Sequence, residues 1–273
     1  YASIAGIVPS TPADFAKLEV GDVIQSIDGT STVNKSLSEI STLLTGLSGT
    51  KTSLVVQRGS ELLTFKLTRQ ELNINPVDSK TLSNGVIVFK INEFSRGTAR
   101  LLRASLAADP SERVGIVLDL RGNPGGLLVE AVDVASAFLS GGEIVEFYKS
   151  GGEKETFNAQ GNGDTKTPIV VLVDSGTASA AEILTAALQE RNRAIIIGNK
   201  TFGKGTVQNT TKLSDGSAIE LTTGYYVTPS GKRIDGEGIE PDILVESTAG
   251  PDLAEEKALQ VIQGLIASAG TWN

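Results

Sequence analysis

A run of five apolar residues, Ile169–Val173, constrains the fold more than any other feature of the sequence. Four of the five are β-branched, and a run with no polar position is typical of a strand that is covered on both faces. A turn of small residues at 174–178 follows, and residues 179–190 then have the Ala and Leu content and the apolar face of a helix. Residues 194–197 form a second short apolar run. The sequence therefore predicts a strand–helix–strand unit inside a layered α/β core.

Strands and helices alternate through most of the chain after about residue 85. Apolar runs predict strands at 86–91, 115–120, 144–149, 206–213 and 219–227. Helical periodicity predicts helices at 98–107, 127–139 and 253–267, with a stop at 109–111 after the first of them. In the second of these helices we expect Leu127, Val134 and Phe138 to face inward. We interpret 71–81, which contains Pro76, as a linker, and the polar residues 151–167 as a loop or an exposed hairpin.

Residues 1 to about 70 predict a separate, small β-rich unit. Residues 10–18 have the pattern of a short capped helix, and 21–29 that of a strand leading into an Asp28-Gly29 turn. Residues 53–58 and 62–68 predict a hairpin across Gly59-Ser60. Residues 37–47 predict a helix whose apolar face carries Leu37, Ile40, Leu43, Leu44 and Leu47.

Composition excludes several classes of partner and site. A net charge of −8 argues against nucleic acid or an anionic membrane surface as the main partner. The longest apolar runs have the length of strands, so we expect no segment to span a bilayer. The chain lacks cysteine, which excludes disulfides and thiolate metal sites, and it lacks methionine, so we expect a mature form or an excised fragment. No cofactor or metal is predicted.

Ser179 is the candidate nucleophile. A serine at a strand-to-helix turn presents its hydroxyl at the end of a sheet, and the helix N-terminus beside it offers N–H groups that stabilise an oxyanion. The chain contains no histidine or cysteine, which excludes a Ser–His–Asp triad and a Cys–His pair. The base therefore has to be a lysine, a carboxylate or a terminal amine. Ser179 and Glu182 also match a capping box, in which the serine only caps its helix.

Lys204 is the candidate base. Gly203 and Gly205 allow the backbone around it to pack closely. A lysine is protonated at pH 7 unless its site is dry and free of carboxylates, and no acidic residue occurs between 201 and 211. Two alternatives stay open: an ordinary surface-loop lysine, and a phosphate-binding loop, which Gly205 disfavours because serine or threonine belongs at that position.

Five stretches, in this order, are similar to motifs of the carboxyl-terminal processing peptidases, the tail-specific Ser–Lys proteases. They are a glycine-rich turn at 116–126, a nucleophile segment at 175–182, a general-base segment at 201–208, and two further stretches at 225–231 and 238–242. Ser179 and Lys204 lie 25 residues apart, which also fits this family. Together the motifs extend over nearly all of the chain after about residue 85, and their combination is specific.

The resemblance implies a crotonase/ClpP-like layered protease core of α/β class at 71–273, preceded at 1–70 by a small PDZ domain. It implies a serine endopeptidase that cuts proteins near their carboxyl end through an acyl-enzyme, with Ser179 as nucleophile and Lys204 as base. Its partners would be proteins or peptides with accessible carboxyl-terminal tails, and a homo-oligomer or a regulatory adaptor. The implied location is extracytoplasmic (periplasm, cell envelope or thylakoid lumen), with membrane association through a segment absent from this chain.

Further residues complete the predicted centre. The N–H of Ala180, directly after the nucleophile, is a natural oxyanion donor, and the resemblance points to Gly125 or Gly126 as the other. As an alternative, these glycines only make a tight turn. Gln208 matches the family's third catalytic residue, and on a strand it faces the same way as Lys204 and orients its amine. An ordinary exposed glutamine is the alternative for Gln208.

The PDZ-like unit departs from the family. Family PDZ domains carry a glycine-containing carboxylate-binding loop and a peptide-pairing strand before the stretch that matches 5–12, so we expect an N-terminally incomplete peptide groove. A catalytically silent, PDZ-bearing peptide-binding scaffold is therefore one alternative, and a hydratase or acyl-thioester enzyme on the same fold is another. Joint retention of the serine, lysine and glutamine favours the peptidase. We interpret Asp119 and Arg121, beside the glycine-rich turn, as structural.

Overall fold

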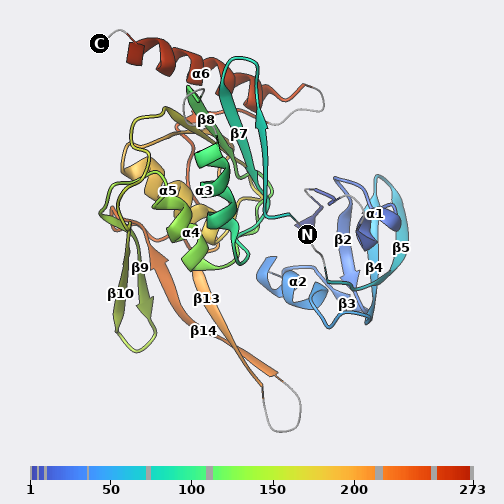
Figure 1. The fold of residues 1–273 in the computed structure, drawn as a ribbon. Coiled ribbons are helices and arrows are strands. Elements are labelled where there is room, and N and C mark those ends of the chain that lie inside the picture. Colours follow the sequence, from blue (N-terminus) through green and yellow to red (C-terminus); the bar gives the residue numbers. More distant parts are fainter. Residues whose placement is uncertain are drawn as a thin grey trace. The chain divides into compact units, whose positions relative to one another are not determined.

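In a computed structural model, the chain divides into two compact units, Tyr1–Ile74 and Asn75–Asn273 (Figure 1). The boundary proposed from the sequence, after residue 70, lies four residues before this division. The structure describes residues 2–4, 6–8, 11–35, 37–71, 75–108, 113–212, 218–246 and 251–270. Within these ranges the side chains of 37–38, 208–212, 218–220 and 269–270 are not described. Each unit has a hydrophobic core of its own.

The first unit is an antiparallel sheet with two short helices. Its strand order is β1-β2-β4-β5, with β3 beside β2. The strands are β1 (Ala2–Ser3), β2 (Val23–Ile27), β3 (Thr30–Ser31), β4 (Lys51–Arg58) and β5 (Glu61–Thr68), and the helices are α1 (Pro12–Phe15) and α2 (Leu37–Leu44). Apolar side chains of β2, β4 and α2 form the core. The pairing of β4 with β5 confirms the predicted hairpin.

One prediction for this unit is wrong. Helix α2 ends at Leu44, so the side chain of Leu47, expected on the buried face of a longer helix, is 81% exposed. The Arg69 guanidinium donates from Nε to the Leu44 carbonyl oxygen (2.8 Å), which satisfies one of the acceptors that a helix end leaves open. The helix predicted from residue 10 begins at Pro12, and Ser10 lies outside the described residues.

The second unit is built on a six-stranded sheet, which confirms the α/β class. The strand order is β15-β12-β11-β8-β7-β6, and all neighbours are parallel except β6 and β7. The strands are β6 (Val77–Thr81), β7 (Val86–Ile91), β8 (Gly115–Asp119), β11 (Ile169–Val173), β12 (Ile195–Gly198) and β15 (Ile243–Leu244). Every residue of β11 is buried, as its unbroken apolar run predicts.

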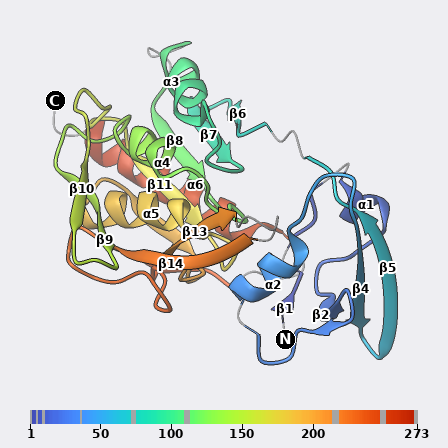
Figure 2. The ribbon, with the colours of Figure 1, turned by 90° about the horizontal axis from the view of Figure 1, so that it is seen from below.

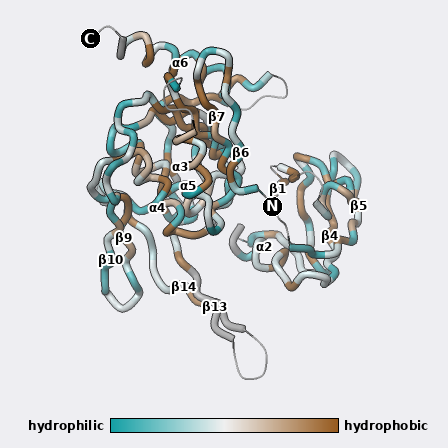
Figure 3. The backbone as a smooth tube through the Cα atoms, in the orientation of Figure 1, coloured by the Kyte–Doolittle hydropathy of each residue, from teal (hydrophilic) through white to brown (hydrophobic). Residues whose placement is uncertain are grey.

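Helices cover both faces of this sheet (Figures 1 and 2). One face carries α3 (Thr98–Ala108), α4 (Leu128–Ala135) and α5 (Ala180–Glu190), and the other carries α6 (Leu253–Gly270). Side chains alternate between the faces: Val171 packs with the three helices, whereas Val170 and Leu172 pack with α6. Figure 3 shows hydrophobic stretches concentrated between these layers. A central strand of this sheet therefore has no position that faces water.

A second, antiparallel sheet packs against the helical face, in the order β10-β9-β14-β13. Its strands are β9 (Glu143–Lys149), β10 (Lys154–Asn158), β13 (Thr206–Lys212) and β14 (Ala218–Val227). The rings of Phe147 and Tyr226 lie 5.5 Å apart between centroids, and both belong to the core. Strands β9 and β10 form a hairpin. Of the two structures predicted for 151–167, a loop or an exposed hairpin, the structure therefore shows the hairpin.

Two predictions for the second unit are wrong in detail. The linker predicted at 71–81 contains β6, which has one buried and four exposed positions and so lacks the apolar pattern of a strand. Leu127, expected to face inward, is 47% exposed because α4 begins after it and Leu127 is its N-cap residue. Val134 and Phe138 are buried as predicted. The helix stop predicted at 109–111 lies outside the described residues.

Candidate active site

The turn between β11 and α5 places Ser179 directly before an 11-residue helix. Ser179 has φ 55° and ψ −118°, and a positive φ is uncommon for a residue other than glycine. A strained strand-to-helix turn of this kind raises the nucleophile of α/β hydrolases above the sheet. The Asp174 carboxylate supports the turn by accepting a hydrogen bond from the Gly176 N–H at 2.9 Å. The half-buried Ser179 thus has the backbone geometry that a nucleophile requires.

Residues 201–205 bring Lys204 to the same place through backbone contacts. The Phe202 N–H donates to the Thr177 carbonyl oxygen at 3.0 Å, so this segment lies beside the nucleophile turn. On its other side, a Cβ added at Gly205 would lie 2.2 Å from the Asp235 backbone nitrogen, a contact that only glycine avoids. Lys204 is half-buried, and its amine has no hydrogen bond or ion pair to any residue that the structure describes.

A buried carboxylate joins the two segments. The Glu182 side chain is fully buried, and its Oε2 accepts hydrogen bonds from the backbone N–H groups of Ser179 and Lys204, both at 2.8 Å. The two backbone nitrogens therefore lie no more than 5.6 Å apart, since both contact one oxygen atom. Oε1 accepts from the Thr201 hydroxyl at 2.5 Å and from the Gly203 N–H at 2.7 Å. Four donors satisfy the carboxylate, and the segments of Ser179 and Lys204 are held together.

The sequence did not show the full importance of Glu182. Its carboxylate accepts a hydrogen bond from the Ser179 N–H, as the predicted capping box requires. The contacts with 201–204 are tertiary, and they place a carboxylate beside the backbone of Lys204 although none is near it in sequence. One signal was available: Glu182 stands among apolar residues in a helix that is buried from Ala180 to Leu188. A buried acid needs donors, and here the base segment supplies them.

The structure gives Gly125 and Gly126 different environments. The Gly125 N–H donates to the Asn123 Oδ1 at 2.8 Å, and a Cβ added at Gly125 would lie 2.8 Å from the Ser179 Cβ. Gly125 therefore permits the close approach of its turn to the nucleophile. The N–H groups of Gly126 and Ala180 have no acceptor among the described residues. Free backbone N–H groups are the type of donor that an oxyanion hole uses, and the assignment of these two stays a prediction.

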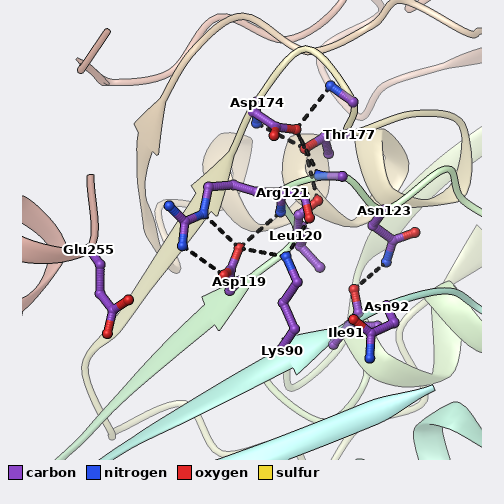
Figure 4. A network of polar contacts seen from close by, with 12 residues as sticks. Lys90, Ile91, Asn92, Asp119, Leu120, Arg121, Asn123, Asp174, Thr177 and Glu255 are labelled. Atoms are coloured by element: carbon purple, nitrogen blue, oxygen red, sulfur yellow. Dashed lines mark hydrogen bonds and ion pairs between the residues drawn. The ribbon is translucent and has the colours of Figure 1, made fainter. Parts of the chain in front are cut away.

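Hydrogen bonds to the end of β7 and to the turn after β11 hold the glycine turn (Figure 4). The buried Asn123 donates from Nδ2 to the Ile91 carbonyl oxygen at 2.8 Å. The Gly122 N–H donates to the Asp174 Oδ1 at 2.8 Å, and the Thr177 hydroxyl donates to the Leu120 carbonyl oxygen at 2.9 Å. Because Asp174 and Thr177 belong to the nucleophile turn, these bonds connect the two turns directly.

Asp119 and Arg121 flank the start of the glycine turn with an ion-pair network (Figure 4). The Arg121 Nη2 lies 2.8 Å from the Asp119 Oδ2, and the Lys90 amine contacts the Arg121 carbonyl oxygen and lies 3.2 Å from the Asp119 Oδ1. Burial raises the pKa of the Asp119 carboxyl, but hydrogen bonds from Arg121 and the charges of Lys90 and Arg121 outweigh it and hold the pKa below its ordinary value. The network keeps Asp119 ionised and Arg121 in place.

Gln208 lies in β13, and its side chain is outside what the structure describes. Lys204 precedes β13, and a register shift between Val207 and Gln208 interrupts the strand, so simple alternation does not place Gln208 on the side of Lys204. Its role stays a prediction. Among the described residues no cluster of three or more His, Cys, Asp or Glu side chains is arranged to hold a metal ion. In the same part of the chain, no helix combines the length and hydrophobicity of a membrane span.

Comparison with known families gives two matches. A model of peptidase family S41 matches residues 85–245, more than half of the 273 residues, and a PDZ domain model matches residues 3–58. The first match contains the segments of Ser179 and Lys204 and the glycine turn. The second falls within the first compact unit.

Individual relatives agree with the family match. The carboxyl-terminal-processing protease of Synechocystis sp. is 38% identical over 274 residues, which cover 95% of this chain and 64% of that protein. The chloroplastic C-terminal processing peptidase of Tetradesmus obliquus is 36% identical, over 87% of this chain and 55% of that protein. A solved structure, the photosystem II D1 C-terminal processing protease, matches with a TM-score of 0.77 and 35% identity, over 95% of this chain and 72% of that one. The chain spans about half to two thirds of the length of the curated relatives it matches.

Proposed function

Because the chain belongs to peptidase family S41, we propose that it is a serine endopeptidase that cleaves proteins near their carboxyl end. The observation that carries the proposal is the Glu182 carboxylate, one oxygen of which binds the backbone of both Ser179 and Lys204. A serine nucleophile in a chain without histidine needs another base beside it. The shared carboxylate supports Lys204 in that role because it holds the two segments together, while its four hydrogen bonds come from backbone N–H groups and the Thr201 hydroxyl and none from the Lys204 amine.

The mechanism is acyl transfer in two halves. The neutral Lys204 amine takes the Ser179 hydroxyl proton as Oγ attacks the scissile carbonyl carbon, and the N–H groups of Ala180 and Gly126 stabilise the oxyanion. The C–N bond then breaks, and the Lys204 ammonium gives its proton to the leaving amine. Water attacks the resulting ester with Lys204 again as base, which releases the new carboxyl end and restores the serine.

The remaining parts of the proposal concern orientation and substrate. Gln208 orients the Lys204 amine, and the reaction uses no cofactor. The PDZ match supports substrates with accessible carboxyl-terminal tails, because domains of this type bind free peptide ends by strand addition. The proposal includes an extracytoplasmic location and, as further partners, another copy of the chain or a regulatory adaptor.

Replacement of the nucleophile tests the proposal. Ser179→Ala should lower peptide cleavage by several orders of magnitude, because the covalent step is lost. It should leave the fold in place, since a lost helix cap costs about 1 kcal/mol. Cleavage of an unstructured peptide, circular dichroism and labelling by a serine-directed acylating probe are the measurements. Undiminished cleavage by the variant would remove Ser179 from the mechanism, and a wild-type chain that neither cleaves nor takes the probe would favour a silent peptide-binding scaffold.

Replacement of the base gives a second, independent test. Lys204→Arg keeps the positive charge but supplies a guanidinium that does not release its proton at working pH, so we expect no cleavage. An arginine variant that cleaves at the wild-type rate would exclude Lys204 as the base.

A further inference from the structure

Helix α6 runs along the strand that leads into the glycine turn. At the start of β8, a Cβ added at Gly115 would lie 2.8 Å from the Ile262 Cγ1, so the middle of α6 rests on this end of the strand. Two residues past the other end of β8, Arg121 pairs with Asp252, the residue directly before α6. Helix α6 is therefore attached near both ends of the strand that carries the turn. It lies on the sheet face opposite α5, as Figure 1 shows.

Asp252 makes two kinds of contact at once. Both of its carboxylate oxygens lie 2.8 Å from the Arg121 Nη1, although 131 residues separate the two in the chain. Its Oδ1 also accepts the Glu255 N–H at 3.0 Å, which caps the first turn of α6. Burial raises the pKa of the Asp252 carboxyl. The hydrogen bonds and the charge of Arg121 lower this pKa by more than burial raises it, so the group stays ionised.

Arg121 connects Asp252 to the glycine turn. Its guanidinium is held on the remaining side by Asp119, with Nε at 2.9 Å and Nη2 at 2.8 Å from the two carboxylate oxygens. A planar guanidinium with five donors can grip two carboxylates in one geometry, which a lysine cannot. The next residue is Gly122, the first glycine of the turn, and the last glycine of the turn, Gly126, has the free N–H. Among the described residues Asp119 and Asp252 are the acidic partners of this cluster, so without Asp252 the cations Lys90 and Arg121 would share the charge of Asp119.

We infer that Asp252 is a positioning residue: through Arg121 it makes the docked N-terminus of α6 part of the support of the oxyanion turn. The inference rests on the proposed function, because it assigns the Gly126 N–H to the oxyanion. Displacement of the start of α6 would act first on the glycine turn, which carries the Gly126 N–H and is hydrogen-bonded to the nucleophile turn through Gly122 and Leu120. A shift of about 1 Å in a catalytic group is enough to lower a rate strongly.

Asp252→Asn is the decisive variant, because asparagine caps helices as well as aspartate and only the ion pair is lost. We expect kcat on a peptide substrate to fall about three- to tenfold, the scale of a partly exposed ion pair, with KM unchanged. Hydrogen exchange should become faster in peptides that cover 121–126. Glu255→Gln is the matched control: it removes the same charge from the same helical turn, and the Glu255 side chain has no partner among the described residues. It should change neither quantity, and Asp252→Glu should restore part of kcat.

Two outcomes would overturn the inference. The first is an Asp252→Asn variant with wild-type kcat and wild-type exchange at 121–126. The second is a lower kcat without faster exchange in this turn, which would mean that Asp252 acts elsewhere. If the wild-type chain shows no cleavage that depends on Ser179, the proposed function fails, and the exchange measurement still decides whether Asp252 holds the turn.

Discussion

Two junctions of the catalytic unit hold backbone segments in place by opposite means. The junction at Glu182 is a single, fully buried carboxylate whose partners are three backbone N–H groups and a hydroxyl. The junction at Arg121 is a network of charged side chains, in which Arg121 and Asp252 keep 22% and 44% of their side-chain surface exposed. The first joins the segments of Ser179 and Lys204, and the second joins the glycine turn to α6.

The difference teaches how each junction should fail. A buried charge held by neutral donors has no water to replace a lost partner, so its removal costs the full desolvation of the groups left behind. Partly exposed ion pairs contribute little each and are weakened by salt, so their loss is graded. We therefore expect that loss of the Glu182 carboxylate disrupts its junction completely, whereas loss of one ion pair in the Arg121 network weakens that junction only in part.

The largest effect should come from Glu182→Gln. The amide keeps the shape but turns an N–H₂ group toward backbone donors, so at least one buried donor is left unsatisfied, at about 1–3 kcal/mol. Misplacing nucleophile and base together should lower kcat by at least about 10²-fold. Thermal unfolding and peptide cleavage measure both quantities.

Glu130→Gln provides the control for Glu182. Glu130 also accepts two backbone N–H groups, from Gly97 at 2.7 Å and Ala99 at 3.0 Å, but it is only half-buried and serves another helix. Its variant should keep kcat. If Glu182→Gln retained wild-type kcat, the tie between the segments of Ser179 and Lys204 would be catalytically unimportant.

A somewhat smaller effect is expected at Gly125, where the glycine turn approaches the nucleophile turn. An alanine there has φ of +100° and a Cβ 2.8 Å from both the Ala178 carbonyl oxygen and the Ser179 Cβ, so the turn must move away from the nucleophile. We expect kcat to fall roughly 10- to 100-fold. Gly122→Ala is the comparison, because Gly122 also has positive φ but open space around its Cβ. Equal rates for the two variants would show that close approach, as distinct from backbone strain, is irrelevant.

Salt should have a moderate effect on kcat through the Arg121 junction and none through the Glu182 junction. At 1 M salt the Debye length is about 3 Å, so the exposed Arg121–Asp252 pair loses part of its strength. The ratio of wild-type kcat to that of Asp252→Asn should therefore shrink between low and high salt. The ratio for Glu182→Gln should stay constant, because its partners are neutral and buried. Parallel salt titrations of the three proteins make the comparison, and a constant Asp252 ratio would argue against an ionic tie.

The smallest effect concerns stability in acid. The pKa values of Asp119 and Asp252 are lowered in the folded protein, so both groups stabilise it fully above about pH 4, their unfolded range. That contribution is lost as pH falls through the lowered values. Asp252→Asn removes the contribution of Asp252 to this stabilisation, which for an exposed ion pair lowers Tm by at most about 3 °C. The Tm difference between wild type and variant should therefore shrink as the pH falls below the unfolded range. A difference that persists in acid would point to packing instead of charge.

Local patterns predicted much of this protein, and long-range pairing explains what they missed. The apolar run at Ile169–Val173 and the alternation around it were sufficient for the layered α/β core. Strand β6 was not predicted because four of its five residues face solvent and it lies at the edge of the sheet, beside β7. Leu47 and Leu127 lie outside the ends of α2 and α4, where periodicity alone does not show that a helix has stopped or not yet begun.

By itself, the sequence determined the chemistry that this chain can perform. With no histidine and no cysteine, a serine nucleophile here depends on a lysine or a carboxylate, whatever the fold. Only the tertiary structure decided which groups are free to act. Gly125 and Gly126 are identical in sequence terms, yet a hydrogen bond to Asn123 occupies one N–H and leaves the other open. Likewise, Glu182 binds the segment of Lys204 because packing brought its carboxylate to donors 19 to 22 residues away in the sequence. Buried polar groups need hydrogen-bond partners, but no local pattern shows which distant residues supply them.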